Sequence, residues 1–312
     1  MSQDVGFETP ILKRVLIILV GLTLAFAVYV LAGLPSRAEV RRLATRNPDR
    51  TSVMRQREEE ARDAGQAPRV QQSWTPLSRM SKHLIHAVLA SEDQKFFGHE
   101  GVDWDAVEKA IEEDRKRLSF ARGGSTITQQ LAKNLYFTTH RSLVRKLREV
   151  IVARWLEEEL GKKRILELYL NVIEWGDGIY GAQAAALRYY GKPASALDEV
   201  EAAGLAAMIP NPHRIHPRLF PQRHARAQRR VLWLMRSAGY LKREMGGLGA
   251  EPPPVEEDDD EPEATPPPGA EVVPPAVEPL PPEAPSPTAN PSQDPAAAGS
   301  PSPDPAASPP SR

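Results

Sequence analysis

The feature that most constrains this chain is an uncharged apolar run near its start, VLIILVGLTLAFAVYVLAGL at residues 15–34. A helix of that length rises roughly 30 Å, at about 1.5 Å per residue, which matches the hydrocarbon core of a bilayer. The run therefore predicts a transmembrane helix at 15–34, preceded by a short segment at 1–14.

A cleavable signal peptide is the alternative, because it too begins basic and then turns apolar. Its apolar core usually has about 7–15 residues, fewer than this run, and LPSRA at residues 34–38 is a poor small-x-small cleavage site. We therefore expect an uncleaved anchor. Charge alone does not set its orientation, because basic residues flank both ends of the run.

The other end of the chain has a different composition. Residues 251–312 hold 21 of the 31 prolines and thirteen acidic residues, with Arg312 as their one basic residue. This segment has few large apolar side chains, so burying them cannot offset the conformational entropy that the chain would lose on folding. We therefore expect a disordered, Pro-rich acidic tail at 246–312. Subtracting residues 251–312 from the totals of 40 basic and 41 acidic residues leaves 39 and 28, a net charge of +11.

Such a basic body suits a polyanionic partner, whether nucleic acid, anionic lipid head groups or a pyrophosphate. Composition does not choose among these three. The absence of cysteine excludes a disulfide scaffold and a thiolate metal site. We also expect no metal–histidine site, because His99, His213 and His216 lack the usual zinc spacing with a matching carboxylate.

Between the two ends, we expect a polar stalk at 35–69 and a mainly helical domain at 70–245. A short strand is expected at 70–74, and helices at 81–91, 142–160, 165–175 and 199–209. The 142–160 helix has an apolar stripe that we expect to face the core, made of Leu143, Leu147, Val150 and Ile151. The 165–175 helix is apolar almost all round and should be buried.

The first candidate for chemistry is the carboxylate pair Glu92 and Asp93, in SEDQKFFGHEG. The pair ends an apolar helix, so Glu92 should be partly desolvated. Desolvation raises the pKa of a carboxyl group and makes it a better base near neutral pH. An ordinary polar helix end, with Asp93 capping the next turn, is the alternative.

The second candidate is the segment RGGSTITQQLAKN at residues 122–134. Thr126 and Gln129 have capping-box spacing, which indicates that a helix begins here. Thr126, Gln130 and Lys133 share one face of that helix, and a Gly-rich entry beside a lysine suits a phosphate- or sugar-binding groove. A solvated helix face is the alternative. The preceding residues 114–124 are basic with an apolar tip, which suits an anionic membrane surface.

The third candidate is RKLRE, in which Arg145 and Glu149 lie four residues apart on one helix face. A surface ion pair, worth about 0.3–0.5 kcal/mol, is the alternative. Val152 and Leu156 continue the same face, which favours a partly covered site. A fourth segment, KKRILELYLN followed by WGDGIYG, we interpret as core and turn.

In this order the four segments resemble the family 51 glycosyltransferases, which contain the peptidoglycan glycosyltransferase domain. The resemblance covers about residues 70–220 and is closest to the monofunctional members, because the chain turns Pro-rich where bifunctional relatives carry a transpeptidase domain. It implies a lysozyme-like fold of two lobes with a cleft. It also implies a cytoplasmic amino terminus and a catalytic domain on the outer, periplasmic face of the bacterial cytoplasmic membrane.

The resemblance implies that the substrate is lipid II, a disaccharide-pentapeptide on undecaprenyl pyrophosphate. Glu92 matches the catalytic glutamate, which deprotonates the 4-hydroxyl of the incoming sugar for an inverting attack on the growing chain. Glu149 matches a second essential glutamate near the leaving group. The expected substrate-binding positions are Asp93, Phe96, His99, Thr126, Gln130, Lys133, Asn134, Arg145 and Lys146.

No cofactor is required, and a divalent cation (Mg²⁺ or Mn²⁺) would be held by the pyrophosphate oxygens rather than by a protein cage. The expected partners are lipid II, the growing glycan chain, membrane lipids and other cell-wall synthesis proteins, but not nucleic acid. A lysozyme-type lytic transglycosylase is the alternative, although it would not need the cations Lys133, Arg145 and Lys146. A non-enzymatic anchor is a third alternative, against which the carboxylates Glu92 and Glu149 argue.

Overall fold

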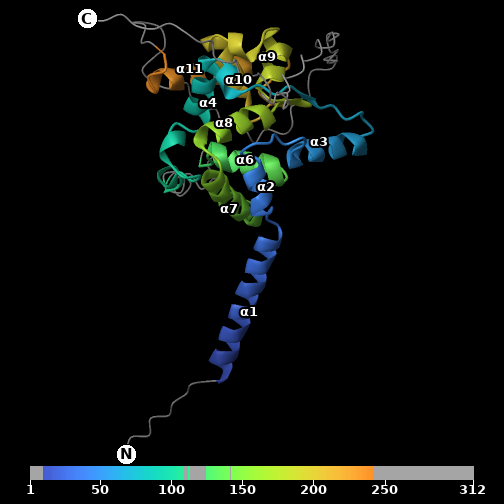
Figure 1. Ribbon diagram of the computed structural model, residues 1–312, viewed down its shortest axis with the longest axis vertical. Coiled ribbons are helices and arrows are strands. Elements are labelled where there is room, and N and C mark those ends of the chain that lie inside the picture. Colours follow the sequence, from blue (N-terminus) through green and yellow to red (C-terminus); the bar gives the residue numbers. More distant parts are fainter. Residues whose placement is uncertain (1–9, 109–111, 113–123, 141, 242–312) are drawn as a thin grey trace, which may run out of the picture. The chain divides into compact units, whose positions relative to one another are not determined.

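Figure 1 shows the computed structural model, which describes residues 10–108, 112, 124–140 and 142–241. The apolar run forms one long helix, α1 (Pro10–Ala32), whose side chains from residue 13 onward are exposed except for Val30. Within the described residues, α1 provides the one stretch long and apolar enough to cross a membrane. The chain thus has one N-terminal apolar helix, consistent with a single-pass anchor. The 246–312 tail and nearly all of the 114–124 loop lie outside the described residues.

The described residues after α1 are mainly helical, as expected. The α-helices are α2 (Arg37–Arg42), α3 (Ser52–Asp63), α4 (Lys82–Glu92), α6 (Ile127–Tyr136), α7 (Leu143–Glu159), α8 (Lys162–Val172), α9 (Ala182–Tyr190), α10 (Glu199–Met208) and α11 (Pro221–Ser237). Short 3₁₀ turns are η1 (Leu77–Arg79), η2 (Phe96–Gly98) and η3 (Ala194–Ala196).

Helices α8 and α10 lie in the core of this body. Leu168, Tyr169 and Leu170 of α8 are fully buried, as its nearly all-round apolar sequence predicts. Helix α10 packs against both α4 and α11 and is rich in alanine, which allows close approach. Gly204 lets α11 come closer still, because a Cβ there would lie 2.9 Å from Nε2 of Gln228.

A small sheet closes the end of α8. Its strand order is β1 (Gln71–Gln72), β3 (Ile179–Tyr180), β2 (Glu174–Gly176), with β1 parallel and β2 antiparallel to β3. The strand expected at 70–74 is present but shorter. Gly178 has a φ of +67°, and a Cβ there would lie 2.5 Å from the carbonyl oxygen of Arg69, so this turn requires glycine.

The segment expected to be a stalk at 35–69 packs onto the domain instead. Val40 of α2 and Met54 of α3 are fully buried, and these helices contact α7 and α6 respectively. Gln56 exchanges two hydrogen bonds with Thr139, at 2.7 Å to Oγ1 and 2.8 Å from the backbone N–H. Few apolar residues suffice here because polar side chains make the remaining contacts.

Helix α7 turns a different face inward from the one that its apolar stripe predicts. Leu143 is 86% exposed and Leu147 is 42% exposed, whereas Glu149, Val152 and Leu156 are buried. The prediction that the leucine stripe faces the core is therefore wrong. The covered face predicted from Val152 and Leu156 is the buried one, and neighbouring cations offset the charge of Glu149 there.

Candidate active site

Glu92 is the last residue of α4, where that apolar helix reaches the polar part of the domain. Its Oε2 atom accepts a 2.8 Å hydrogen bond from Nε2 of Gln130 on α6. The hydroxyl of the buried Tyr169 on α8 donates a 2.9 Å hydrogen bond to Oε1 of the same Gln130. Burial raises the pKa of Glu92, while the Gln130 hydrogen bond and the charge of Lys133 oppose that rise. Glu92 is thus suited to general base catalysis.

Asp93 joins the end of α4 to the start of α6. Both of its carboxylate oxygens lie 3.0 Å from Nε2 of His99. Its Oδ2 atom also accepts a 3.0 Å hydrogen bond from the backbone N–H of Ile127, the first residue of α6. The carboxylate therefore also lies at the positive end of that helix. These contacts fix the position of the adjacent Glu92 relative to α6.

Thr126 and Phe96 belong to the same frame. Thr126 is the N-cap of α6, as its spacing from Gln129 predicts, and its buried hydroxyl donates a 2.6 Å hydrogen bond to the carbonyl of Gly101. Phe96 is fully buried, with Nζ of Lys162 4.4 Å from its ring centroid. Both side chains make internal contacts that support the site. Direct substrate contacts by Asp93, Phe96, His99 and Thr126 stay predictions.

Lys133 lies one helical turn after Gln130 on α6. It is half-buried on α6, and burial lowers its pKa. The negative charges of Glu149 and Glu92 oppose this lowering of the pKa, and the positive charges of Arg145 and Lys146 add to it. The neighbouring Asn134 is buried and donates a 2.8 Å hydrogen bond to the carbonyl of Gln130. Helix α6 thus supplies several polar groups to one region.

Glu149 is a buried carboxylate on α7 with two cations beside it. Its Oε1 atom lies 3.0 Å from Nε of Arg145, and its Oε2 atom lies 3.5 Å from Nζ of Lys146. Arg145 also donates a 3.0 Å hydrogen bond to the carbonyl of Thr138, and Lys146 donates a 2.6 Å one to Oγ of Ser125. Two positive charges and one negative charge leave this cluster net positive. It can therefore attract a phosphate or pyrophosphate group.

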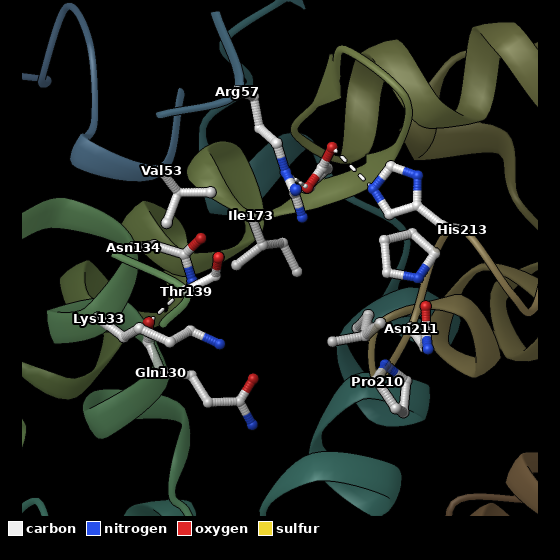
Figure 2. Close-up of a pocket in the computed structure, with 13 residues that line it drawn as sticks. Val53, Arg57, Gln130, Lys133, Asn134, Thr139, Ile173, Pro210, Asn211 and His213 are labelled. Carbon is white, nitrogen blue, oxygen red and sulfur yellow. Dashed lines mark hydrogen bonds and ion pairs between the residues drawn. The ribbon is translucent and has the colours of Figure 1, made fainter. Parts of the chain in front are cut away.

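A pocket of about 190 Å³ opens beside Lys133 (Figure 2). Gln130 and Lys133 extend toward it from α6, and Pro210 and His213 face them from the segment after α10. The full lining is Val53, Arg57, Gln130, Lys133, Asn134, Thr139, Ile173, Glu174, Ile209, Pro210, Asn211, Pro212 and His213. The pocket therefore shares Gln130 and Lys133 with the surroundings of Glu92.

The sequence predictions missed a charged group in the pocket wall. Nε of Arg57 lies 3.1 Å from Oε2 of Glu174, and Nε2 of His213 lies 3.3 Å from Oε1 of the same carboxylate. Glu174 lies just after the buried helix α8, and Glu92 is likewise the last residue of the apolar helix α4. A carboxylate at the end of a buried helix is therefore a sequence signal that could have identified Glu174. Arg57 carried no such signal, because its segment reads as a solvated stalk.

The fold and the site together define a class of enzyme. A half-buried glutamate with a raised pKa can accept a proton. A net positive cluster around a second glutamate can stabilise an anionic leaving group. A helical domain with both parts is suited to group transfer from a phosphorylated donor.

Comparison with known proteins agrees with this class. The family model described as Transglycosylase matches residues 58–236. The biosynthetic peptidoglycan transglycosylase of Azoarcus sp. (strain BH72) is 45% identical over 212 residues, which cover 67% of this chain and 92% of the relative. The biosynthetic peptidoglycan transglycosylase of Herminiimonas arsenicoxydans is 50% identical over 166 residues, which cover 53% of this chain and 72% of the relative. The biosynthetic peptidoglycan transglycosylase of Dechloromonas aromatica (strain RCB) is 45% identical over 201 residues, which cover 64% of this chain and 84% of the relative.

The chain therefore belongs to the transglycosylase family. The resemblance to the family 51 glycosyltransferases, drawn from four short segments, is confirmed, and so is the assignment as an enzyme. The match begins at residue 58, inside α3, which agrees with the packing of that helix onto the domain.

Proposed function

We propose that this protein is a peptidoglycan glycosyltransferase that polymerises lipid II into β-1,4-linked glycan strands. One observation carries the proposal: helix α6 contacts both parts, because Gln130 donates to Glu92, the candidate base, and Gln129 accepts a 3.3 Å hydrogen bond from Lys146, an ion-pair partner of Glu149. The base and the leaving-group site are thus parts of one site. The biosynthetic names of the relatives support polymerisation and do not favour the lytic alternative.

The proposed reaction is a single inverting displacement. Glu92 takes the proton from the 4-hydroxyl of the incoming lipid II sugar while that oxygen bonds to the anomeric carbon of the growing chain. The bond between the anomeric carbon and the pyrophosphate oxygen breaks, and undecaprenyl pyrophosphate leaves with the bonding electrons. The raised pKa of Glu92 supports its role, because a more basic carboxylate accepts the proton more readily.

In this proposal the cations act on the leaving group. Negative charge grows on the pyrophosphate as the bond breaks, and Lys133, Arg145 and Lys146 offset it. Glu149 keeps Arg145 and Lys146 in place through its two ion pairs, at 3.0 and 3.5 Å.

The pocket beside Lys133 is proposed to hold sugars of the growing chain. Amides from Gln130, Asn134 and Asn211 can donate to and accept from sugar hydroxyl groups, and the carboxylate of Glu174 can accept. Ile173 and Pro210 supply apolar surface for the faces of a sugar ring. This mixture of polar and apolar lining supports a glycan rather than the lipid as occupant.

A divalent cation at the pyrophosphate remains part of the proposal. Among the described residues, no group of three or more His, Cys, Asp or Glu side chains could hold a metal ion. The carboxylate of Glu149 already has two cationic partners, so it is poorly suited as a metal ligand. The donor set therefore supports an ion held mainly through substrate oxygens.

The membrane location is proposed in the same way. A cytoplasmic amino terminus would put the catalytic domain on the periplasmic face of the cytoplasmic membrane, where membrane lipids and other cell-wall synthesis proteins would be its partners. Resistance to carbonate extraction, with an intact amino terminus, is the expected result. A mature protein that begins near Arg37 would show instead that residues 15–34 are a signal peptide.

The function is tested by incubating the purified full chain with lipid II. Polymerisation predicts long glycan strands and one released undecaprenyl pyrophosphate for each bond formed. Incubation with intact sacculi is the matched experiment and should release no soluble fragments. Soluble muropeptides from sacculi, without polymer from lipid II, would establish the lytic alternative.

A further inference from the structure

The anchor helix α1 ends against α7, the helix that carries Glu149. Arg148 of α7 donates a 3.0 Å hydrogen bond from Nε to the carbonyl of Val30 and a 2.5 Å one from Nη2 to the carbonyl of Tyr29. These carbonyls belong to the last four residues of α1, whose C=O groups have no i+4 partners within the helix. The same guanidinium lies 5.0 Å from the ring centroid of Tyr29.

An arginine suits this contact for several physical reasons. A planar guanidinium can serve two carbonyl groups at once, and its charge is favourable at the negative end of a helix dipole. The carbonyl of Val30 also accepts a 3.3 Å hydrogen bond from the N–H of Gly33, so Arg148 adds a second donor there. Gly33 also leaves the necessary space, because a Cβ built there would overlap the guanidinium of Arg148.

A second contact joins the segment after the anchor to the other end of α7. Arg37 pairs with Glu158, and Nε of Arg41 lies 2.7 Å from Oε2 of Glu159. Positions 148 and 158 are ten residues apart, or about 15 Å along a helix axis. Helix α7 is therefore held by the end of the anchor near Arg148 and by α2 near its own last residues.

We propose that Arg148 is a positioning residue that couples the membrane anchor to the catalytic site through α7. One side of α7 contacts α1, while its buried side presents Glu149 with Arg145 and Lys146. Because the anchor is fixed in the bilayer, the Arg148 contact sets the height of this cationic cluster above the membrane surface. That height determines how well the cluster meets a lipid-linked pyrophosphate. This inference rests on the proposed function, since it requires a lipid-linked donor.

The test compares two settings for the full-length Arg148→Ala variant. In liposomes that contain lipid II, the substrate phosphate is held at the bilayer surface, and we expect polymerisation to fall at least fivefold through a higher apparent KM. With a short-chain lipid II analogue in detergent, nothing fixes the height of the phosphate, and the rate should stay within twofold of wild type. Arg148→Lys keeps a cationic donor and should restore part of the activity in liposomes.

A substitution on the anchor side provides an independent approach. Gly33→Leu places a side chain where the guanidinium lies, so it should produce the same loss in liposomes. The two variants disrupt one contact, and combining them should add little further loss. Arg229→Ala is the control, because Arg229 is an exposed helical arginine on α11. It should behave as wild type in both settings.

Measuring the depth of α7 relative to the bilayer distinguishes a positioning role of Arg148 from a general loss of structure. The chain has no cysteine, so Leu143→Cys, at the exposed start of α7, can carry one spin label. The label should show a single depth in liposomes with Arg148 present and a broad distribution with Arg148→Ala. An unchanged depth, or an equal loss of rate in liposomes and detergent, would overturn the proposal. If the wild type made no polymer in either setting, the proposed function itself would fail.

Discussion

The side-chain amide of Gln130 donates a 2.8 Å hydrogen bond to Oε2 of Glu92, and this bond favours the ionised carboxylate. Burial has the opposite and larger effect, because the pKa of Glu92 is raised overall. The hydroxyl of Tyr169 fixes the orientation of the amide from the other side. The candidate base is therefore tuned by a hydrogen bond that a single substitution can remove.

Gln130→Ala should move the acidic limb of the pH–rate profile. Losing a hydrogen bond to the charged form raises the pKa of Glu92 further, and Glu92 acts as a base only when ionised. Activity should thus be lost at a higher pH as the solution is acidified. At neutral pH, we expect a fall of about tenfold, the equivalent of roughly 1.4 kcal/mol for a hydrogen bond to a charged group.

The matched control is Gln94→Ala, which removes an exposed glutamine close to Glu92 in sequence. Its acidic limb should coincide with that of the wild type. If the acidic limb of the pH–rate profile did not move in Gln130→Ala, a group other than Glu92 would control that limb.

Glu149→Ala should destabilise the domain. The substitution leaves Arg145 and Lys146 without their shared, buried counter-charge. Removing one partner of a buried ion pair typically costs about 3–5 kcal/mol, and we expect the lower end because the side chain of Lys146 is 41% exposed. Chemical denaturation should show the loss, and Glu59→Ala, an exposed change on α3, should not. A Glu149→Ala variant as stable as wild type would mean that Glu149 serves substrate rather than structure.

The sequence predicts much of the fold because local signals agree with the structure there. The cap at Thr126 and the burial of Tyr169 follow from residue spacing and from a nearly all-apolar helix. For α7 the sequence gives two signals that conflict: the leucine stripe indicates the wrong face, whereas Val152 and Leu156 indicate the face of Glu149, which is the buried one. Leu143 is apolar yet 86% exposed, so the leucine stripe alone gives the wrong orientation.

The candidate site, like the fold, can be predicted from the sequence only in part. Motifs that are contiguous in sequence predict Glu92 and Glu149 as site residues, and the structure shows the hydrogen bond from Gln130 to Glu92. The pocket wall is built by residues from distant segments, Arg57 before the domain and His213 after α10. No local sequence pattern indicates that these two side chains both contact the carboxylate of Glu174, because only the tertiary fold brings them together.

Arg57→Ala should shorten the glycan product. Without Arg57, Glu174 loses its 3.1 Å ion pair and the pocket loses part of its wall. If the pocket holds the growing chain, strands should dissociate earlier, while the rate of the first transfer stays within about twofold because Glu92 is untouched. Strand length can be measured on gels of labelled polymer.

The control for this experiment lies on the same helix. Arg62 of α3 pairs with Glu58 at 3.5 Å and is 57% exposed, so Arg62→Ala should give strands of normal length. Equal strand lengths for Arg57→Ala and wild type would remove the pocket from the path of the glycan.

The last prediction separates the base from the cation beside it. Glu92→Gln keeps the shape of the side chain but cannot take a proton, so polymerisation should fall by about 10²–10⁴-fold. A moenomycin-type phosphoglycolipid, which imitates the lipid phosphate and sugars, should still bind this variant, because its phosphate would meet Lys133 and Arg145. Lys133→Ala removes a charge partner instead, so both turnover and phosphoglycolipid affinity should fall. Turnover and affinity should be measured side by side on folded protein. If Glu92→Gln kept a third or more of normal turnover, Glu92 could not be the base, and Glu149 would become the leading candidate.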